Sequence, residues 1–187
     1  IGEVSDVKKI LSPVLVANPA YPVYHIDFSF SPLALGGSAF AQALGQLGDE
    51  TPRIEEPEYF REAFTAVQEL IQRGVLTAGH DISGGGLITA LLEMCFPSTK
   101  GGLSVDLTAF PEDDIVKLLF AENPGVLVQT SHPEILEEVL RDASIGFARI
   151  ATPTTDGRTL SVSYGKKSTL TLDIDAKRDL WYRSSYL

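Results

Sequence analysis

The sequence predicts an α+β fold: a layered α/β/α domain with a mixed, largely antiparallel sheet. Segments with the two-residue period of strands alternate with segments that have the 3.6-residue period of helices. Strand-like segments slightly outnumber helical ones, and several neighbouring strands are joined by hairpin-like turns. These observations favour an α+β domain over a doubly wound Rossmann sheet.

The 187 residues fit one large domain with short extensions. We expect an irregular N-terminal arm at residues 1–22, where three prolines prevent a long helix. The folded domain should occupy residues 23–175, and a terminal helix capped by Asp175 should follow at 176–187. Because the chain starts at Ile1 without a Met, we expect it to be a segment of a longer protein.

Strands are predicted where apolar residues alternate with polar ones or form a short apolar run. The run at 125–130 is continuously apolar, so this strand should lie centrally in its sheet. Asp156-Gly157 predicts a hairpin between the two strands that flank it. The expected strands are 23–28, 103–107, 125–130, 147–151, 159–164 and 170–174, with a further short extended run from Leu76.

Helices are predicted where apolar residues recur every three or four positions. The clearest is 55–73, with Pro57 in its first turn and Gly74 after its last. Ser131 and Glu134 form a capping box for the helix at 133–142. Other expected helices are 39–44, a helix after the glycines at 84–86 that ends before Pro97, and 111–120.

Composition excludes several classes of protein. The net charge of −10 and the pI near 4.7 argue against nucleic acid as a direct partner. No apolar run is long enough to span a bilayer, so we expect no membrane contact. Cys95 is the single cysteine, which excludes a disulfide framework and suits a reducing cytoplasm.

The stretch with the most chemical content is a strand that leads through His80, Asp81 and Ser83 into Gly84, Gly85 and Gly86, and then into a helix. We call residues 83–86 the glycine turn. The first N–H groups of a helix have no partner within it, and glycines let the backbone approach a phosphate closely. The carboxylate of Asp81 would repel a phosphate, which predicts a divalent cation between them.

Two known phosphate motifs are excluded at this turn. No Lys-Ser/Thr pair follows the glycines, as a P-loop requires, and the G-x-G-x-x-G spacing of dinucleotide sites is absent. Spacing alone leaves a second interpretation open, in which the glycines only relieve crowding in a tight strand-to-helix connection.

A second glycine segment, Gly36, Gly37 and Ser38, precedes the helix at 39–44 and is a possible second anion contact. Ser38 also fits a simple N-cap that needs no ligand. We expect His25 and Cys95 to be structural residues and identify no catalytic residue in this chain.

Four motifs together closely resemble the phosphoribosylformylglycinamidine synthase family of purine biosynthesis. They are L-G-G-S-A-F-A-Q-A-L-G-Q-L-G-D, G-H-D-I-S-G-G-G-L, L-L-E-M-C-F and F-A-E-N-P-G-V-L-V, and the tail L-W-Y-R-S-S-Y adds to them. The similar part is the second C-terminal-type lobe of the long single-chain enzyme. This lobe belongs to the aminoimidazole ribonucleotide synthetase superfamily, whose C-terminal lobe has the layered α/β/α fold predicted above.

The resemblance implies a function for the parent protein. The family is an ATP-dependent carbon–nitrogen ligase of the amidotransferase type. It uses ATP and glutamine-derived ammonia to convert formylglycinamide ribonucleotide to its amidine. The arm would come from a preceding lobe and the terminal helix would lead to a further domain. The implied partners are the other lobes and the glutaminase domain of the same parent chain, and this chain alone is expected to be inactive.

The resemblance also implies roles at the glycine turn. Asp81 would hold Mg²⁺, Ser83 would hydrogen-bond phosphate, His80 would orient the turn, and the N–H groups of Gly84, Gly85 and Gly86 would line the site. The nucleotide, ATP or ADP, is expected to be auxiliary rather than consumed. The family's usual S-D-G-G-L has Gly84 in place of its Asp here, which puts the number of metal ions in doubt.

Two alternatives remain open. The chain could be a lobe of another superfamily member, such as selenophosphate synthetase, the hydrogenase maturation protein or thiamine-monophosphate kinase. It could also be a non-catalytic interaction domain whose glycines are purely steric, in which case it binds no nucleotide.

Overall fold

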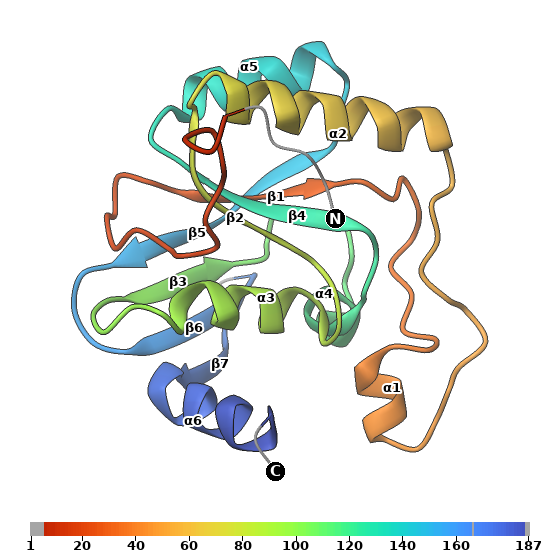
Figure 1. Ribbon diagram of the computed structural model, residues 1–187. Helices are drawn as coiled ribbons and strands as arrows, with labels where there is room; N and C mark the ends of the chain where they lie inside the picture. The colour runs from red at the N-terminus through yellow and green to blue at the C-terminus, as the bar shows by residue number, and fades with distance from the viewer. Residues whose placement is uncertain (1–5, 166, 186–187) are drawn as a thin grey trace.

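The computed structural model describes residues 6–165 and 167–185, which fold around a seven-stranded sheet (Figure 1). The strand order is β2-β4-β1-β5-β3-β6-β7, and β3 with β6 forms the parallel pair among antiparallel ones. The predicted mixed, largely antiparallel α+β sheet is confirmed. The strands are β1 (Val23–Asp27), β2 (Leu76–Asp81), β3 (Gly102–Asp106), β4 (Gly125–Thr130), β5 (Phe147–Thr154), β6 (Thr159–Tyr164) and β7 (Lys167–Asp173).

Helices cover both faces of this sheet. Figure 1 places α2 and α5 on one face and α3 and α4 on the other, and α6 contacts α3. The short α1 lies on a long excursion away from the sheet (Figure 1). The helices are α1 (Ala39–Ala43), α2 (Pro57–Gln72), α3 (Gly86–Cys95), α4 (Ile115–Phe120), α5 (Pro133–Asp142) and α6 (Ile174–Ser185).

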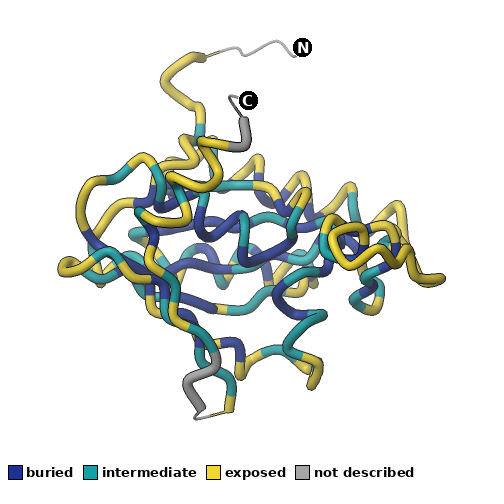
Figure 2. The backbone as a smooth tube through the Cα atoms, turned by 90° about the horizontal axis from the view of Figure 1, so that it is seen from below, coloured by how far each residue is buried: buried dark blue, intermediate teal, exposed yellow. Residues whose placement is uncertain are grey.

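Two hydrophobic cores lie on opposite faces of the sheet, because successive side chains of a strand point to opposite faces. On β1, Tyr24 and Ile26 pack against α2 and α5, whereas Val23 belongs to the core under α3. Figure 2 shows the buried residues along the strands and inner helix faces, with exposed residues on the loops and the N-terminal arm. Both cores are built mainly from aliphatic side chains, which can exclude water without unpaired polar atoms.

The central position predicted for the apolar run 125–130 is confirmed, since β4 lies between β2 and β1. The predicted hairpin at Asp156-Gly157 is wrong. The strands that flank this turn, β5 and β6, do not pair with each other, because β3 lies between them. A short polar turn therefore connects two strands that are next-nearest neighbours in the sheet.

Three predicted helix starts also differ from the structure. The capping box at Ser131 is wrong: the N-cap is His132, whose N–H is held instead by Thr130 Oγ1 at 2.9 Å. Helix α4 begins at Ile115 rather than near Pro111, because Asp114 accepts from the N–H groups of Val116 and Lys117. Helix α6 begins at Ile174, which places Asp175 in its first turn rather than at its cap.

No helix in residues 6–165 and 167–185 has the length and apolar character needed to cross a membrane.

Truncation of a buried residue of α2 should separate core packing from surface contacts. Leu70 is fully buried, whereas Phe64 on the same helix is 51% exposed. Leu70→Ala should lower the free energy of unfolding by about 2–5 kcal/mol, because it leaves a cavity under α2. Phe64→Ala is the matched control and should cost less than about 1 kcal/mol in urea denaturation. Equal losses for the two variants would contradict the assigned packing of α2.

Candidate functional site

The glycine turn connects the end of β2 at Asp81 to the start of α3 at Gly86. Gly85 is the N-cap of α3 with φ 90°, and Gly86 follows with φ 71°, conformations that favour glycine. A Cβ on Gly86 would lie 2.7 Å from the carbonyl carbon of Phe120, so α3 starts in close contact with the end of α4. The predicted order of strand, glycine turn and helix is therefore present, and part of its glycine content is steric.

Space remains on the outer side of the turn. A Cβ on Gly84 would have no atom within 4 Å, and both Ser83 and Gly84 are exposed. The N–H of Gly86 donates to the carbonyl of Ser83 at 3.0 Å, which closes the turn. Within the described part of the chain, the N–H groups of Ser83 and Gly84 have no acceptor. The turn thus presents two exposed backbone donors at the N-terminus of a ten-residue helix with no side-chain cap.

Asp81 is the last residue of β2, two positions before the glycine turn, and it lines a surface cleft together with Val67 and Ile71 of α2. Its side chain is 72% exposed and does not point into either core. A carboxylate in this position is accessible to a cation or a ligand.

The neighbouring His80 is turned the other way, with a side chain only 17% exposed. Its Nδ1–H donates to the carbonyl of Asp81 at 2.7 Å, and its Nε2 lies 3.4 Å from Glu93 Oε2. Trp181 of α6 donates to the other oxygen of Glu93 at 3.1 Å. The imidazole therefore links the end of β2 to Glu93 of α3, and Glu93 in turn bonds to Trp181 of α6.

A residue outside the predicted set links the two glycine segments. One oxygen of Glu122, Oε1, accepts from the N–H of Gly85 and from the N–H of Ala39, each at 2.8 Å. Ala39 directly follows the second glycine segment, so the structure brings together the two regions that the sequence singled out. The motif F-A-E-N-P-G contains Glu122, so a signal for this residue was present in the sequence. Its bonding partners could not be predicted from a local pattern, because Gly85 is 37 positions and Ala39 is 83 positions away in the sequence.

The second glycine segment is occupied by contacts within the chain. The N–H of Gly36 donates to the carbonyl of Glu50 and that of Gly37 to the carbonyl of Leu47, both at 2.7 Å. Ser38 Oγ accepts from the N–H of Ala41, as an N-cap does. An anion at this segment would have to displace these internal acceptors.

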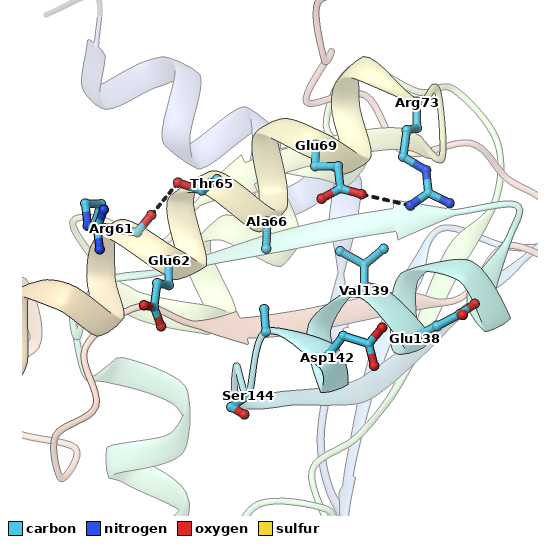
Figure 3. A pocket seen from close by; sticks show the side chains of 11 residues that line it. Arg61, Glu62, Thr65, Ala66, Glu69, Arg73, Glu138, Val139, Asp142 and Ser144 are labelled. Carbon is cyan, nitrogen blue, oxygen red and sulfur yellow. Dashed lines mark hydrogen bonds and ion pairs between the residues drawn. The ribbon is translucent and has the colours of Figure 1, made fainter.

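A surface cleft of about 810 Å³ lies elsewhere, between α2 and α5 (Figure 3). Side chains of both signs line it, and Arg73 pairs with Glu69 at 2.9 Å. None of the predicted site residues lines this cleft, which lies on the opposite face of the sheet from α3.

Two reactive residue types are held in inert forms. Burial raises the pKa of the Cys95 thiol to about 12, so at neutral pH it is a protonated core residue and not a nucleophile. Burial lowers the pKa of His25 to about 4, with a partial offset from Asp27, so its imidazole is neutral. The predicted core position of Cys95 is confirmed, since this last residue of α3 is buried in the core between α3 and the sheet.

The described residues contain no cluster of three or more His, Cys, Asp or Glu side chains that could hold a metal ion. Asp81 alone would supply one oxygen ligand. This fits Mg²⁺, which is commonly held by one or two carboxylates together with ligand phosphates and water. It does not fit zinc, which needs three or four protein ligands.

Comparison with known proteins identifies the fold family. The sequence profile of the AIR synthase related protein, C-terminal domain, matches residues 28–162, which is more than half of the chain.

The chain belongs to this family.

Named relatives of this AIR synthase related domain are much longer than the chain. A probable phosphoribosylformylglycinamidine synthase of Caenorhabditis elegans is 37% identical over 75% of the chain and 12% of the relative. The human phosphoribosylformylglycinamidine synthase is 40% identical over 60% of the chain and 8% of the relative. An Arabidopsis thaliana relative, named as probable and chloroplastic/mitochondrial, is 32% identical over 97% of the chain and 13% of the relative.

Solved structures agree on the fold. The Thermotoga maritima PurL complexed with FGAR has a TM-score of 0.70 at 16% identity, and the match covers 91% of the present chain and 29% of the PurL chain. The same protein complexed with ATP has a TM-score of 0.69 at 15% identity, and the match covers 90% of the present chain and 27% of the PurL chain.

Paired alanine substitutions should separate the steric glycine from the open one. Gly86→Ala should lower the free energy of unfolding by about 2 kcal/mol or more, because φ is positive and the Cβ meets the backbone of Phe120. Gly84→Ala, the matched control in the same turn, should leave stability unchanged or raise it by up to about 1 kcal/mol. Thermal or urea unfolding of the two variants tests this. A larger loss for Gly84→Ala than for Gly86→Ala would contradict the geometry of the turn.

Protonation of His25 should lower the free energy of unfolding as the pH falls. The pKa of His25 is about 4 in the fold against 6.5 in the unfolded chain, so the unfolded state binds the proton first as the pH falls. His25 has no effect above pH 6.5, lowers the free energy of unfolding progressively between pH 6.5 and 4, and costs at most about 3 kcal/mol. The difference between wild type and His25→Gln, measured by urea denaturation at several pH values, isolates this effect from the carboxylates. A difference that stays constant from pH 7.5 to 4.5 would contradict it.

Proposed function

We propose that this chain is one lobe of a phosphoribosylformylglycinamidine synthase. That ligase uses ATP and glutamine-derived ammonia to convert formylglycinamide ribonucleotide to its amidine. The family assignment, the names of the relatives and the four sequence motifs support the proposal. The observation that carries it is the pair of exposed residues Ser83 and Gly84, whose N–H groups have no acceptor among the described residues, two positions after an exposed Asp81.

In this proposal the glycine turn binds the phosphates of ATP or ADP. The N–H groups of Ser83 and Gly84 donate to phosphate oxygens, and the positive end of the α3 dipole favours the negative charge there. Gly85 and Gly86 give the backbone the left-handed conformations that expose these donors. The hydroxyl of Ser83 adds a donor, and His80 orients Asp81 from the protein side.

Asp81 is the residue that would hold Mg²⁺. When bound, the cation would neutralise charge between the carboxylate and the phosphates, which an acidic chain with net charge −10 requires. Gly84 stands where the family usually has a second Asp, so this chain is proposed to supply a single carboxylate ligand. The second glycine segment (Gly36, Gly37 and Ser38) is proposed as a secondary anion contact, which requires displacement of its internal acceptors.

The lobe is proposed to act as part of a larger protein and to be inactive alone, because Cys95 is a buried, protonated core residue and the other lobe would supply most of the nucleotide site. Its partners would be the other lobes and the glutaminase domain of the parent chain. The nucleotide at this lobe would be auxiliary, holding the lobe in place rather than being consumed. A cytoplasmic location is also part of the proposal.

Removal of the Asp81 charge tests this function. In the full-length protein, Asp81→Asn should weaken Mg-ADP binding by about 2–4 kcal/mol, or roughly 30- to 1,000-fold in Kd, because the bridging cation loses its protein ligand. Isothermal titration with Mg-ADP measures this directly. Asp142→Asn, a surface carboxylate lining the α2–α5 cleft, is the control and should bind as wild type does.

Unchanged Mg-ADP affinity in Asp81→Asn would rule out the proposed metal contact. Absence of nucleotide binding in the wild-type full-length protein would favour the interpretation of the lobe as an interaction domain with purely steric glycines.

A further inference from the structure

We propose that Glu122 is a positioning residue that fixes the two glycine segments to each other and decides which backbone donors a phosphate ligand can use. The inference rests on the proposed function for its ligand and on the geometry of Glu122 for its mechanism. Glu122 lies half-buried in the loop between α4 and β4. Its contacts are the N–H groups of Gly85 and Ala39.

The N–H groups of Gly85 and Ala39 bond to the same oxygen of Glu122, so the positions of the two segments depend on each other. Both N–H groups donate to Oε1 at 2.8 Å, so the two chain segments converge on a single atom. Charge-assisted hydrogen bonds of a carboxylate to backbone donors are about twice as strong as neutral ones. A displacement of one segment must therefore break its bond to Glu122 or move the other segment with it.

Packing around Glu122 holds the same arrangement. The ring of Phe40, in α1, stacks on the ring of Phe120 at 4.5 Å with an angle of 22°. Gly86 lies against the backbone of Phe120, where a side chain would not fit. The end of α4 therefore contacts α1 on one side and the start of α3 on the other, and Glu122 follows two residues later.

Asn123, the residue after Glu122, bonds to a third segment, the loop at residues 31–34. Its side chain is buried, accepts from the N–H of Ala34 at 3.1 Å, and donates to Ser31 Oγ and the carbonyl of Pro32 at 3.1 and 3.0 Å. The loop that leads from β1 into the second glycine segment is thus fixed by the residue next to Glu122. The dipeptide Glu122-Asn123 therefore bonds to the glycine turn, to the start of α1 and to the loop at residues 31–34.

The negative charge of Glu122 also has a consequence for ligand binding. It occupies the N–H groups of Gly85 and Ala39 and disfavours a second anion at the same point. Within residues 83–86, the N–H groups left without an acceptor among the described residues are those of Ser83 and Gly84, and both residues are exposed. The next residues along α3, Leu87 and Ile88, are buried. Glu122 therefore directs a phosphate to the N–H groups of Ser83 and Gly84, on the outer side of the turn.

Three variants separate positioning from simple stability. Glu122→Ala removes the shared acceptor, whereas Glu122→Gln keeps one carbonyl oxygen that can accept from both N–H groups. Asp114→Ala is the matched control. Asp114 caps the N-terminus of α4, the helix that precedes Glu122, so its loss should destabilise α4 without removing a contact to either glycine segment.

Hydrogen exchange of this chain, followed by NMR, tests the shared contact. In Glu122→Ala the amides of Gly85 and Ala39 should both exchange at least about tenfold faster, because both lose their acceptor. Glu122→Gln and Asp114→Ala should keep both rates within about threefold of wild type. Faster exchange at only one of the two amides, or at neither, would overturn the inference.

Mg-ADP titration of the full-length protein tests the effect on the ligand. Glu122→Ala should raise Kd at least about tenfold at a temperature where all variants are folded, whereas Glu122→Gln should bind as tightly as wild type or more tightly, and Asp114→Ala as wild type. A Kd for Glu122→Ala within threefold of wild type would overturn the positioning role. Failure of the wild type to bind Mg-ADP would instead overturn the proposed function and with it the ligand part of the inference, while the exchange rates still decide whether Glu122 joins the two segments.

Discussion

The bond from one carboxylate oxygen to two distant backbone donors is the interaction on which the candidate site depends. Glu122 joins Gly85, at the start of α3, to Ala39, at the start of α1, and no other described residue bonds to both. The excursion that carries α1 projects from the sheet (Figure 1), and Glu122 holds it together with the Phe40–Phe120 stacking and the bonds of Asn123. The site is therefore organised from the loop between α4 and β4 rather than from the glycines alone.

The glycine turn combines two constraints that the sequence could not separate. Gly86 must be glycine because α4 leaves no room for a side chain, whereas Gly84 faces open space. Crowding and ligand access were treated as competing interpretations of the same three glycines. In the structure they apply to different residues, two positions apart in the same turn.

Local patterns predicted most of the elements and few of the pairings. Helix α2 and the strand, glycine turn and helix around Asp81 were predictable because each is specified by periodicity and caps within a short window. The Asp156-Gly157 turn misled because turn chemistry reports that the chain reverses and not which strand it pairs with. The insertion of β3 between β5 and β6 is set by long-range packing, as are the contacts of Glu122.

The account has one central physical claim: backbone donors at Ser83 and Gly84, with a cation on Asp81, bind the phosphates of a nucleotide. The most direct measurement is a crystal structure of the full-length protein with ADP and Mn²⁺ in place of Mg²⁺, with the metal located by anomalous scattering. The predicted result is a metal peak within coordination distance of an oxygen of Asp81, and a phosphate oxygen about 3 Å from the backbone nitrogen of Ser83 or Gly84. Nucleotide bound elsewhere in this lobe, with Asp81 facing only water, would contradict it.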